Sequence, residues 1–349
     1  MSMKKNIFGM TVPELAEVFR SIGAEAYRAK QLAKWLYEDG VSDFGQMSNL
    51  PSALREKLTA NYTADMATVA TAWTSADRRT DKYLLAFADG NAVETVLMRQ
   101  PYGNSVCVST QVGCAMGCIF CASTIGGLVR NLSAAEILTQ IMHVKQVLRH
   151  ERQKLTNIVI MGSGEPLSNY ENVVEFIRLC HDEAVLGIGY RNITLSTAGI
   201  VPAMERLALE GLPITLAISL HAPNDELRAK IMPINRRYPL ASVVKAGDFY
   251  AEKTGRRVTY EYTLIKGMND QPIHAEQLSG LLRGCLANVN LIPLNPVKES
   301  GLARPDERTI KSFIDILRAR RIESTVRREM GSDIAAACGQ LRKSYRAGE

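Results

Sequence analysis

The sequence lacks the features that mark several large classes of protein. No apolar run reaches the length of about 20 residues that a membrane-spanning helix needs. Lys4 and Lys5 near the start are not followed by the apolar segment of a secretory signal. Internal repeats and low-complexity tracts are absent as well. We therefore expect a soluble, cytoplasmic protein without membrane contact, in a compartment where thiols stay reduced.

Cysteine is scarce, and its distribution is informative. The 349 residues include seven cysteines, an odd number in a chain large enough to fold without cross-links, so a disulfide framework is not expected. Cys114, Cys118 and Cys121 form a C-x3-C-x2-C motif with no fourth cysteine close by. Four thiolates would fill the corners of a [4Fe-4S] cluster, whereas three leave one iron open. A molecule with an amine and a carboxylate could chelate that iron.

Two other interpretations of this motif remain. A structural zinc site usually has four ligands, and the nearest histidine, His143, falls inside a predicted helix. Plain buried thiols are the second alternative. We favour the open cluster over both.

Charge and apolar content set only broad limits. The net charge of +6 permits an anionic partner such as RNA but does not require one. With 46% apolar residues, the chain can form one large domain and a small one.

The chain divides into three predicted regions. Residues 1–75 form a helical accessory domain, with amphipathic helices over 12–22, 28–37 and 50–58. Residues 76–104 form a hairpin linker that carries Glu94, with strands over 83–87 and 92–98 around Asp89-Gly90. Residues 105–349 alternate short apolar strands with helices, which is typical of a parallel sheet. We therefore predict an α/β fold with a full or partial TIM-type (β/α) barrel as its core and a segment that carries Cys338 at its C-terminal end. The predicted core strands are 105–112, 157–161, 192–197, 214–220, 258–265, 288–294 and 323–327, and the predicted helices are 134–149, 171–181, 201–210, 242–253, 274–282 and 307–320.

Polar residues gather where the predicted strands end. Active sites of such barrels lie at the carboxyl ends of the strands. The residues that follow strand ends are the three motif cysteines, the turn Gly162-Ser-Gly-Glu-Pro166, Ser196, the segment Ser219-Leu-His221, and Asn295. Any one of these polar residues alone would more often be structural. Their shared position predicts a single site.

Two cysteines outside the motif form a second group. Cys107 shares a strand face with Ser105 and Ser109, which we expect to face the barrel interior. Cys338 lies among small residues and precedes Gly339, so it fits poorly as a buried hydrophobe. Cys180 and Cys285 lie in helical apolar stripes and fit that role well.

The cysteine spacing resembles that of the radical S-adenosylmethionine (SAM) enzymes, and further motifs resemble one subfamily of them. These motifs are Met161–Leu167, Leu195–Thr197, Leu216–Asn224, Asn290–Pro296 and Asp333–Leu341. From about residue 10 to 345, the chain is similar to the dual-specificity 23S rRNA and tRNA adenine-C2 methyltransferases and to their C8-methylating antibiotic-resistance relatives. It departs from the common pattern at Ser163 and Ala198, neither of which removes a catalytic group.

The resemblance implies the cofactors and their ligands. Cys114, Cys118 and Cys121 would bind a [4Fe-4S] cluster, and its open iron would bind SAM. The residues implied to contact SAM are Gly164, Glu165, Ser196, Ser219, Leu220, His221 and Asn295.

The resemblance also implies a mechanism that uses two SAM molecules per turnover. The first would methylate Cys338, and the second would give a 5′-deoxyadenosyl radical that takes a hydrogen atom from the S-methyl group. The S-methylene radical would then add to the adenine. Glu94 would remove the ring proton, and Cys107 would release the product by forming a transient disulfide with Cys338.

The implied partners are nucleic acids and an electron donor. The substrates would be an adenine in the peptidyl-transferase region of 23S rRNA and an adenine in tRNA, in single-stranded or loop segments where a base can leave its stack. The electron donor would be a protein such as flavodoxin or ferredoxin, and we expect a monomer. Eight arginines are candidate phosphate contacts, although any one of them taken alone is more often a solvated surface charge. They are Arg78, Arg79, Arg130, Arg236, Arg237, Arg327, Arg328 and Arg342. The helical module is either an RNA-recognition element or a packing cap.

The sequence alone leaves three alternative functions open. C8 methylation by the same machinery is the nearest. A radical SAM enzyme acting on a small molecule or a protein would not need the pair Cys107 and Cys338. A non-catalytic RNA-binding protein with a structural or sensory cluster would not need the polar groups at the strand ends.

Overall fold

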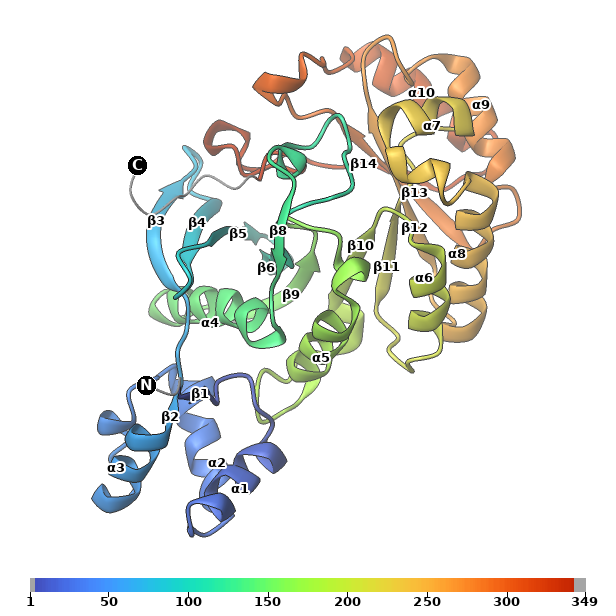
Figure 1. The fold of residues 1–349 in the computed structure, drawn as a ribbon. Coiled ribbons are helices and arrows are strands. Elements are labelled where there is room, and N and C mark those ends of the chain that lie inside the picture. Colours follow the sequence, from blue (N-terminus) through green and yellow to red (C-terminus); the bar gives the residue numbers. More distant parts are fainter. Residues whose placement is uncertain (1–3, 342–349) are drawn as a thin grey trace.

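The computed structural model describes residues 4–341, in which a helical module packs beside an open (β/α) barrel (Figure 1). The module contains α1 (Val12–Ser21), α2 (Arg28–Ala33), which continues into a π-helical turn at Lys34–Asp39, and α3 (Ser52–Asn61). Parallel pairing of β1 (Lys5–Asn6) with β2 (Tyr62–Thr63) joins the two ends of the module. The three predicted N-terminal helices are confirmed.

The module is attached to α4 (Ala134–His150), a helix of the barrel. Lys145 Nζ donates to Tyr37 O at 2.6 Å, and Gln146 Nε2 donates to Gly40 O at 3.0 Å. Gly9 has a φ of +89°, and a Cβ built on it would lie 2.7 Å from Ala135 Cβ. The two parts therefore share one continuous apolar core.

Ten strands form the main sheet, in the order β14-β13-β12-β11-β10-β9-β6-β5-β4-β3. Seven strands run parallel: β6 (Gly103–Cys107), β9 (Leu155–Ile160), β10 (Ile193–Thr197), β11 (Thr215–Ser219), β12 (Val258–Leu264), β13 (Ala287–Pro293) and β14 (Ser324–Val326). The remaining three continue the sheet in antiparallel fashion: β5 (Ala92–Gln100), β4 (Thr80–Ala86) and β3 (Thr68–Thr74). Within residues 4–341, β14 and β3 are the two free edges of the sheet, so the barrel is partial. A partial barrel is one of the two forms predicted from the sequence.

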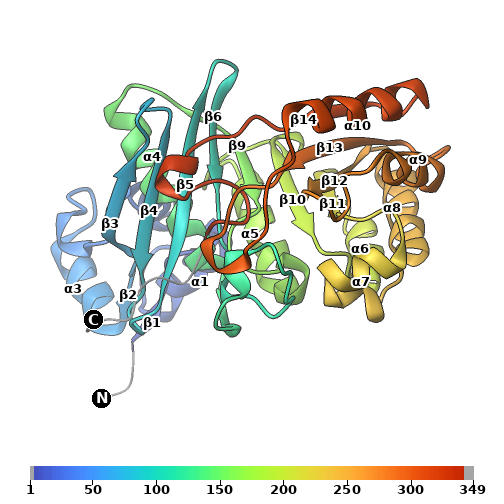
Figure 2. The ribbon, with the colours of Figure 1, turned by 90° about the horizontal axis from the view of Figure 1, so that it is seen from above.

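Helices cover the outer face of the parallel strands (Figures 1 and 2). They are α4, α5 (Tyr170–His181), α6 (Val201–Ala208), α8 (Leu240–Thr254), α9 (Pro272–Leu281) and α10 (Glu307–Ala319). Their starts follow local sequence signals, because Ser133 and Glu136 form a capping box before α4 and Asp306 accepts from Thr309 N before α10. None of the helices in the described range has both the length and the apolar character needed to cross a bilayer.

Several elements of the described residues were not predicted, and the two longest of them are a strand and a helix. The strand β3 is exposed along its whole length at the edge of the sheet, so it carries little of the apolar alternation that indicates a strand. The helix α7 (Asp225–Ile231) has seven residues, too few for a clear helical period, although the Asn224 side chain caps it by accepting from Leu227 N.

The first predicted core strand, 105–112, is wrong in its extent. The strand β6 ends at Cys107, and the backbone then bonds to the Gly162-Ser163 turn: Gly162 N donates to Val108 O at 3.0 Å and Thr110 N to Ser163 O at 2.9 Å. The chain continues into β7 (Gln111–Gly113), which pairs with β8 (Leu128–Asn131) in a separate ribbon. The apolar run is continuous in sequence, but the backbone changes partner within it. This ribbon joins the two ends of the cysteine loop.

After β14 the chain crosses the interior side of the sheet toward β4 and β5 (Figure 2). We call residues 327–341 the C-terminal segment. Asp333 Oδ2 accepts from Ala76 N at 2.8 Å, and Lys82 Nζ donates to Ala335 O at 3.3 Å. These contacts place Cys338 between the two halves of the sheet.

We predict that Gly9→Ala lowers the free energy of unfolding by about 2–4 kcal/mol, because a side chain there combines left-handed backbone strain with overpacking against Ala135. Gly23→Ala is the matched control, since Gly23 has a φ of +68° but open space around its Cβ position. It should lose only about 1 kcal/mol. Urea denaturation measures both, and equal losses would contradict the close packing of the module on α4.

Candidate active site

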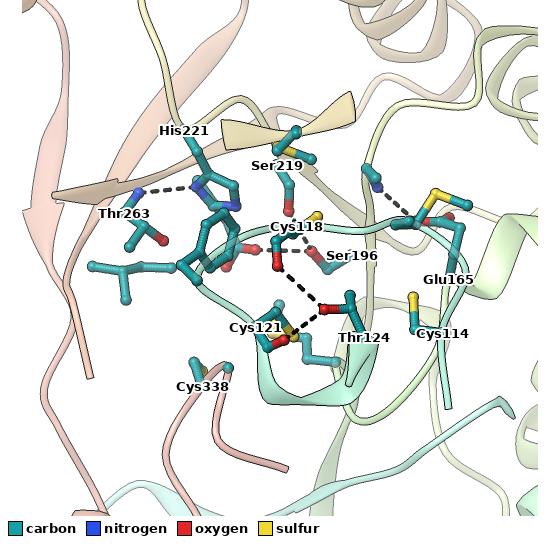
Figure 3. A pocket seen from close by; sticks show the side chains of 18 of the residues that line it. Cys114, Cys118, Cys121, Thr124, Glu165, Ser196, Ser219, His221, Thr263 and Cys338 are labelled. Carbon is teal, nitrogen blue, oxygen red and sulfur yellow. Dashed lines mark hydrogen bonds between the residues drawn. The ribbon is translucent and has the colours of Figure 1, made fainter. Parts of the chain in front are cut away.

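A cavity at the carboxyl ends of the strands brings the predicted site residues together (Figure 3). Among its lining residues are Cys114, Cys118, Cys121, Gly164, Glu165, Ser196, Ser219, His221, Asn295 and Cys338. We call this the cysteine cavity. Of the predicted SAM contacts, Leu220 does not line it: the Leu220 side chain packs in the main core, and its backbone N–H donates to Glu261 O at 3.0 Å.

The loop that carries the three cysteines is held from three sides. Thr124 Oγ1 donates to the carbonyl oxygens of Cys118 and Cys121, at 3.3 and 2.9 Å (Figure 3). Ile119 N donates to Ile231 O at the end of α7 (3.1 Å), and Ala122 N donates to Gly339 O in the C-terminal segment (2.7 Å). The loop conformation therefore depends on elements distant in sequence, which no local motif indicates.

The cysteine donors fit an iron–sulfur cluster. Across residues 4–341, no three His, Cys, Asp or Glu side chains are placed to hold a single metal ion, and a cubane does not need this because each thiolate binds its own iron. Burial raises the pKa of Cys114 to about 11 and raises those of Cys118 and Cys121 above their usual range. The free thiols are therefore protonated at neutral pH, and a bound cation would displace those protons.

Glu165 is a fixed carboxylate in the cavity wall. Its Oε1 accepts from Thr197 Oγ1 and its Oε2 from Ala198 N, both at 2.7 Å. Burial raises its pKa, and these hydrogen bonds oppose that shift. The preceding Gly164 has a φ of +106°, and a Cβ there would lie 2.6 Å from Gln111 Cβ, so only glycine fits this turn.

A second polar network lines the same cavity. Ser196 Oγ donates to Glu261 Oε2 at 2.8 Å, and Glu261 Oε1 pairs with Arg327 NH1 at 3.1 Å. Arg327, proposed from sequence as a phosphate contact on the surface, instead lies in the site beside Met161 Sδ (3.5 Å). Glu261 was missed, although a single carboxylate in the apolar strand 258–264 could have indicated it.

His221 is held as a neutral hydrogen-bond donor. Its Nδ1 accepts from Thr263 N at 2.9 Å, which assigns the proton to Nε2 (Figure 3). Burial lowers its pKa to about 3, so the ring stays uncharged at physiological pH. The Phe120 ring meets it edge-on, with centroids 4.9 Å apart. The φ of +56° at His221 shows that the chain bends sharply after β11.

Cys338 lies in the wall between the cysteine cavity and a second cavity. Asn295 Nδ2 donates to the backbone carbonyl oxygen of Cys338 at 3.0 Å. Four residues line both cavities: Ile292, Asn295, Arg327 and Cys338. The second cavity, which we call the inner cavity, is also lined by Met98, Gln100, Tyr102, Ser105, Arg304, Arg328 and Ala336. A group carried on Cys338 can therefore face two separate spaces.

Cys107 and Glu94 lie beneath the C-terminal segment on neighbouring strands. Cys107 pairs with Val96 and packs against Ala336, and burial raises its pKa to about 12. Glu94, two residues from Val96 along β5, is on the same face of the sheet. It lines neither cavity and is only 2% exposed. The structure thus brings Cys107 to Cys338 but keeps Glu94 covered.

Lys82 on β4 links Glu94 to the C-terminal segment. Its Nζ lies 3.0 Å from Glu94 Oε1 and donates to Ala335 O, and it sits over the Trp73 ring at 4.7 Å. No pattern in the sequence singles out Lys82, because lysine in a strand next to a hairpin is ordinary. The pairing arises only from the register of β4 and β5.

The other candidate phosphate contacts differ in availability. Arg130 is engaged by Asp89 at 2.6 Å and Glu136 at 2.7 Å. The exposed ones are Arg78, Arg79, Arg236, Arg237 and Arg328. Arg342 lies outside the described residues.

Comparisons with known proteins agree with this arrangement. Residues 108–276 match the Radical SAM superfamily, and residues 5–63 match the ribosomal RNA large subunit methyltransferase N-terminal domain. A relative from Symbiobacterium thermophilum, "Probable dual-specificity RNA methyltransferase RlmN", is 55% identical over 96% of this chain and 90% of its own. One of the same name from Desulforamulus reducens is 50% identical, over 98% and 97%. The crystal structure of a radical SAM methyltransferase from Sphaerobacter thermophilus is 45% identical and superposes with a TM-score of 0.95, over 97% of this chain and 100% of that one.

We predict that Lys82→Met lowers the free energy of unfolding by about 3–5 kcal/mol, because it leaves the buried Glu94 carboxylate without its lysine partner. The double variant Lys82→Met with Glu94→Met should be more stable than the sum of the two single losses predicts. Urea denaturation of the four proteins measures this coupling. Strictly additive losses would mean that the pair does not interact.

Proposed function

The chain belongs to the RlmN family of dual-specificity RNA methyltransferases, within the radical SAM superfamily, and on that premise we propose that it methylates C2 of an adenine in 23S rRNA and of an adenine in tRNA. The position of Cys338 between two cavities carries the proposal. A methyl carrier must meet the methyl donor on one side and the acceptor base on the other. A radical SAM enzyme without a carrier needs only one such space.

The cysteine cavity would hold a [4Fe-4S] cluster on Cys114, Cys118 and Cys121, with SAM beside it. When bound, these groups supply a 5′-deoxyadenosyl radical after an electron arrives from a protein such as flavodoxin or ferredoxin. The Glu165 carboxylate and the turn at Gly164 suit the SAM ammonium. Ser196, Ser219, His221 and Asn295 supply polar groups for its ribose, carboxylate and adenine, and Leu220 offers only backbone.

Cys338 would act first as a nucleophile. Burial raises its pKa, and the Arg327 guanidinium opposes that rise by favouring the thiolate. The thiolate sulfur would attack the methyl carbon of one SAM, forming an S–CH3 bond as S-adenosylhomocysteine leaves. Arg327 is held for this role by Glu261.

The inner cavity would receive the adenine after it leaves its stack. Arg328 and the exposed Tyr102 at its mouth are suited to a phosphate and a base. After the S-methylene radical has added to the ring, the adduct would return one electron to the oxidised cluster, and Glu94 would accept the ring proton. Because Glu94 is covered by the C-terminal segment, this step requires that segment to shift from its contact with Lys82.

Cys107 would then release the product. Its thiolate attacks the Cys338 sulfur, which forms the disulfide and breaks the bond from sulfur to the transferred carbon. That carbon keeps the electron pair and gains a proton to become the methyl group. The two cysteines are oxidised, so an external reductant must restore both thiols before the next turnover.

The first test is nucleoside mass spectrometry after incubation of the anaerobically reconstituted protein with SAM, a reductant and unmodified 23S rRNA or tRNA. We expect 2-methyladenosine from both RNAs. An 8-methyladenosine product would assign the chain to C8 methylation instead. Cys338→Ala should abolish RNA methylation while iron content and reductive SAM cleavage remain, and methylation by this variant would exclude the carrier mechanism.

Cys107→Ala should stop the reaction after the carbon bond has formed. We expect a covalent RNA–protein species, visible as a band of retarded mobility on a denaturing gel and removed by ribonuclease. Cys180→Ala is the matched control, because Cys180 is a buried thiol packed in the helical layer, away from both cavities. Normal product release by the Cys107 variant would contradict its role as resolving cysteine.

A further inference from the structure

Arg228 on α7 is a fully buried cation whose hydrogen-bond partners are all neutral. Its relative exposure is 0%, the lowest possible for so large a side chain. Its guanidinium donates to Ala198 O (2.7 Å), Ser219 O (3.0 Å), Asn235 Oδ1 (3.0 Å), Leu220 O (3.1 Å) and Tyr238 O (3.3 Å). No carboxylate in the described part of the chain lies within ion-pair distance of it. Every other buried cation of the site discussed above has such a partner.

The positive charge of Arg228 is therefore solvated but not neutralised. Burial lowers its pKa to about 10, which still leaves it protonated at neutral pH. Carbonyl dipoles stabilise an ion without cancelling its charge, and in a poorly polarisable interior its field reaches neighbouring groups with little screening. The surrounding structure thus carries a fixed positive charge.

The helix α7, which carries Arg228, is attached to the cysteine loop. Cys118 packs in one apolar cluster with Ile231, the last residue of α7, and with Met232, which follows it. Ile119 N donates to Ile231 O at 3.1 Å, so the loop and the helix are locked together. Arg228 also reaches the cavity directly, because its NH2 donates to Ala198 O at 2.7 Å and to Ser219 O at 3.0 Å, and both residues line the cysteine cavity.

We propose that Arg228 tunes the reduction potential of the cluster bound by Cys114, Cys118 and Cys121. The inference rests on the proposed function only in requiring that the cluster is present. Reduction adds one electron and makes the cluster more negative by one charge, without making or breaking a bond. A fixed buried cation stabilises the reduced form more than the oxidised form and so raises the potential. Electron delivery to the site becomes easier as a result.

An EPR-monitored redox titration of the full chain, reconstituted anaerobically without SAM and reduced by dithionite, tests this. Arg228→Met and Arg228→Gln should lower the reduction equilibrium constant at least tenfold, which is a shift of about 59 mV to more negative potential for one electron. Arg228→Lys keeps the charge and should keep most of the potential. Lys230→Met is the matched control, because Lys230 lies on the same helix but is exposed and paired with Glu226; it should not change the potential.

Each outcome separates the alternatives. An unchanged potential in the neutral variants, with full iron content, would overturn the inference. An equal shift in Arg228→Lys would assign the effect to the lost hydrogen bonds and would also overturn it. If the wild-type protein binds no cluster, the proposed function fails instead.

A second variant decides the matter if both neutral variants fail to fold. Asn235 is buried, and its Oδ1 accepts from Arg228 NH1 at 3.0 Å. Asn235→Asp keeps this acceptor but gives Arg228 a carboxylate partner that neutralises its charge, so it should shift the potential downward. An unchanged or higher potential, with full iron content, would contradict the proposal.

Discussion

The docking of the C-terminal segment on the cysteine loop is the contact on which the site depends. Ala122 N donates to Gly339 O, and Ser123 Oγ donates to Leu341 O at 2.7 Å across 218 residues of sequence. Neither the loop nor the segment has a regular ladder of its own to fix it. Each is ordered by the other, and together they set the position of Cys338 relative to the three ligand cysteines.

Charges around this contact are stabilised in two different ways. Lys82 and Glu94 neutralise one another, and Arg327 is neutralised by Glu261. Arg228 has only neutral acceptors. A neutral pair holds geometry and projects little field, whereas an uncompensated cation projects a field and needs a rigid shell of dipoles. The interior of this protein therefore contains ion pairs that hold side chains in place and a buried cation that sets the local electrostatic potential.

The sequence predicted the local features of this protein well. The cysteine spacing, the alternation of strands and helices, and the polar residues at strand ends are all short-range patterns, and they indicated the α/β class and the ligand cysteines and strand-end polar residues that line the cysteine cavity. The comparisons do not test the assigned roles of Glu94, Cys107 and Cys338, which stay predictions. Features that depend on tertiary pairing were not predictable in this way. The partner change after Cys107, the Lys82–Glu94 pair, the burial of Arg228 and the pairing of Arg327 with Glu261 arise from contacts between distant segments.

The sheet of this protein has two edges, β14 and β3, that do not meet. The gap between them is spanned by the C-terminal segment, which is held by side chains and turns and not by a strand ladder. A nucleotide inside an RNA chain is connected to further nucleotides on both sides, so it cannot enter a closed barrel end-first. It must enter from the side, through an opening along the length of the barrel. An open sheet provides such an opening, because the C-terminal segment can detach locally while the ten-stranded sheet stays intact.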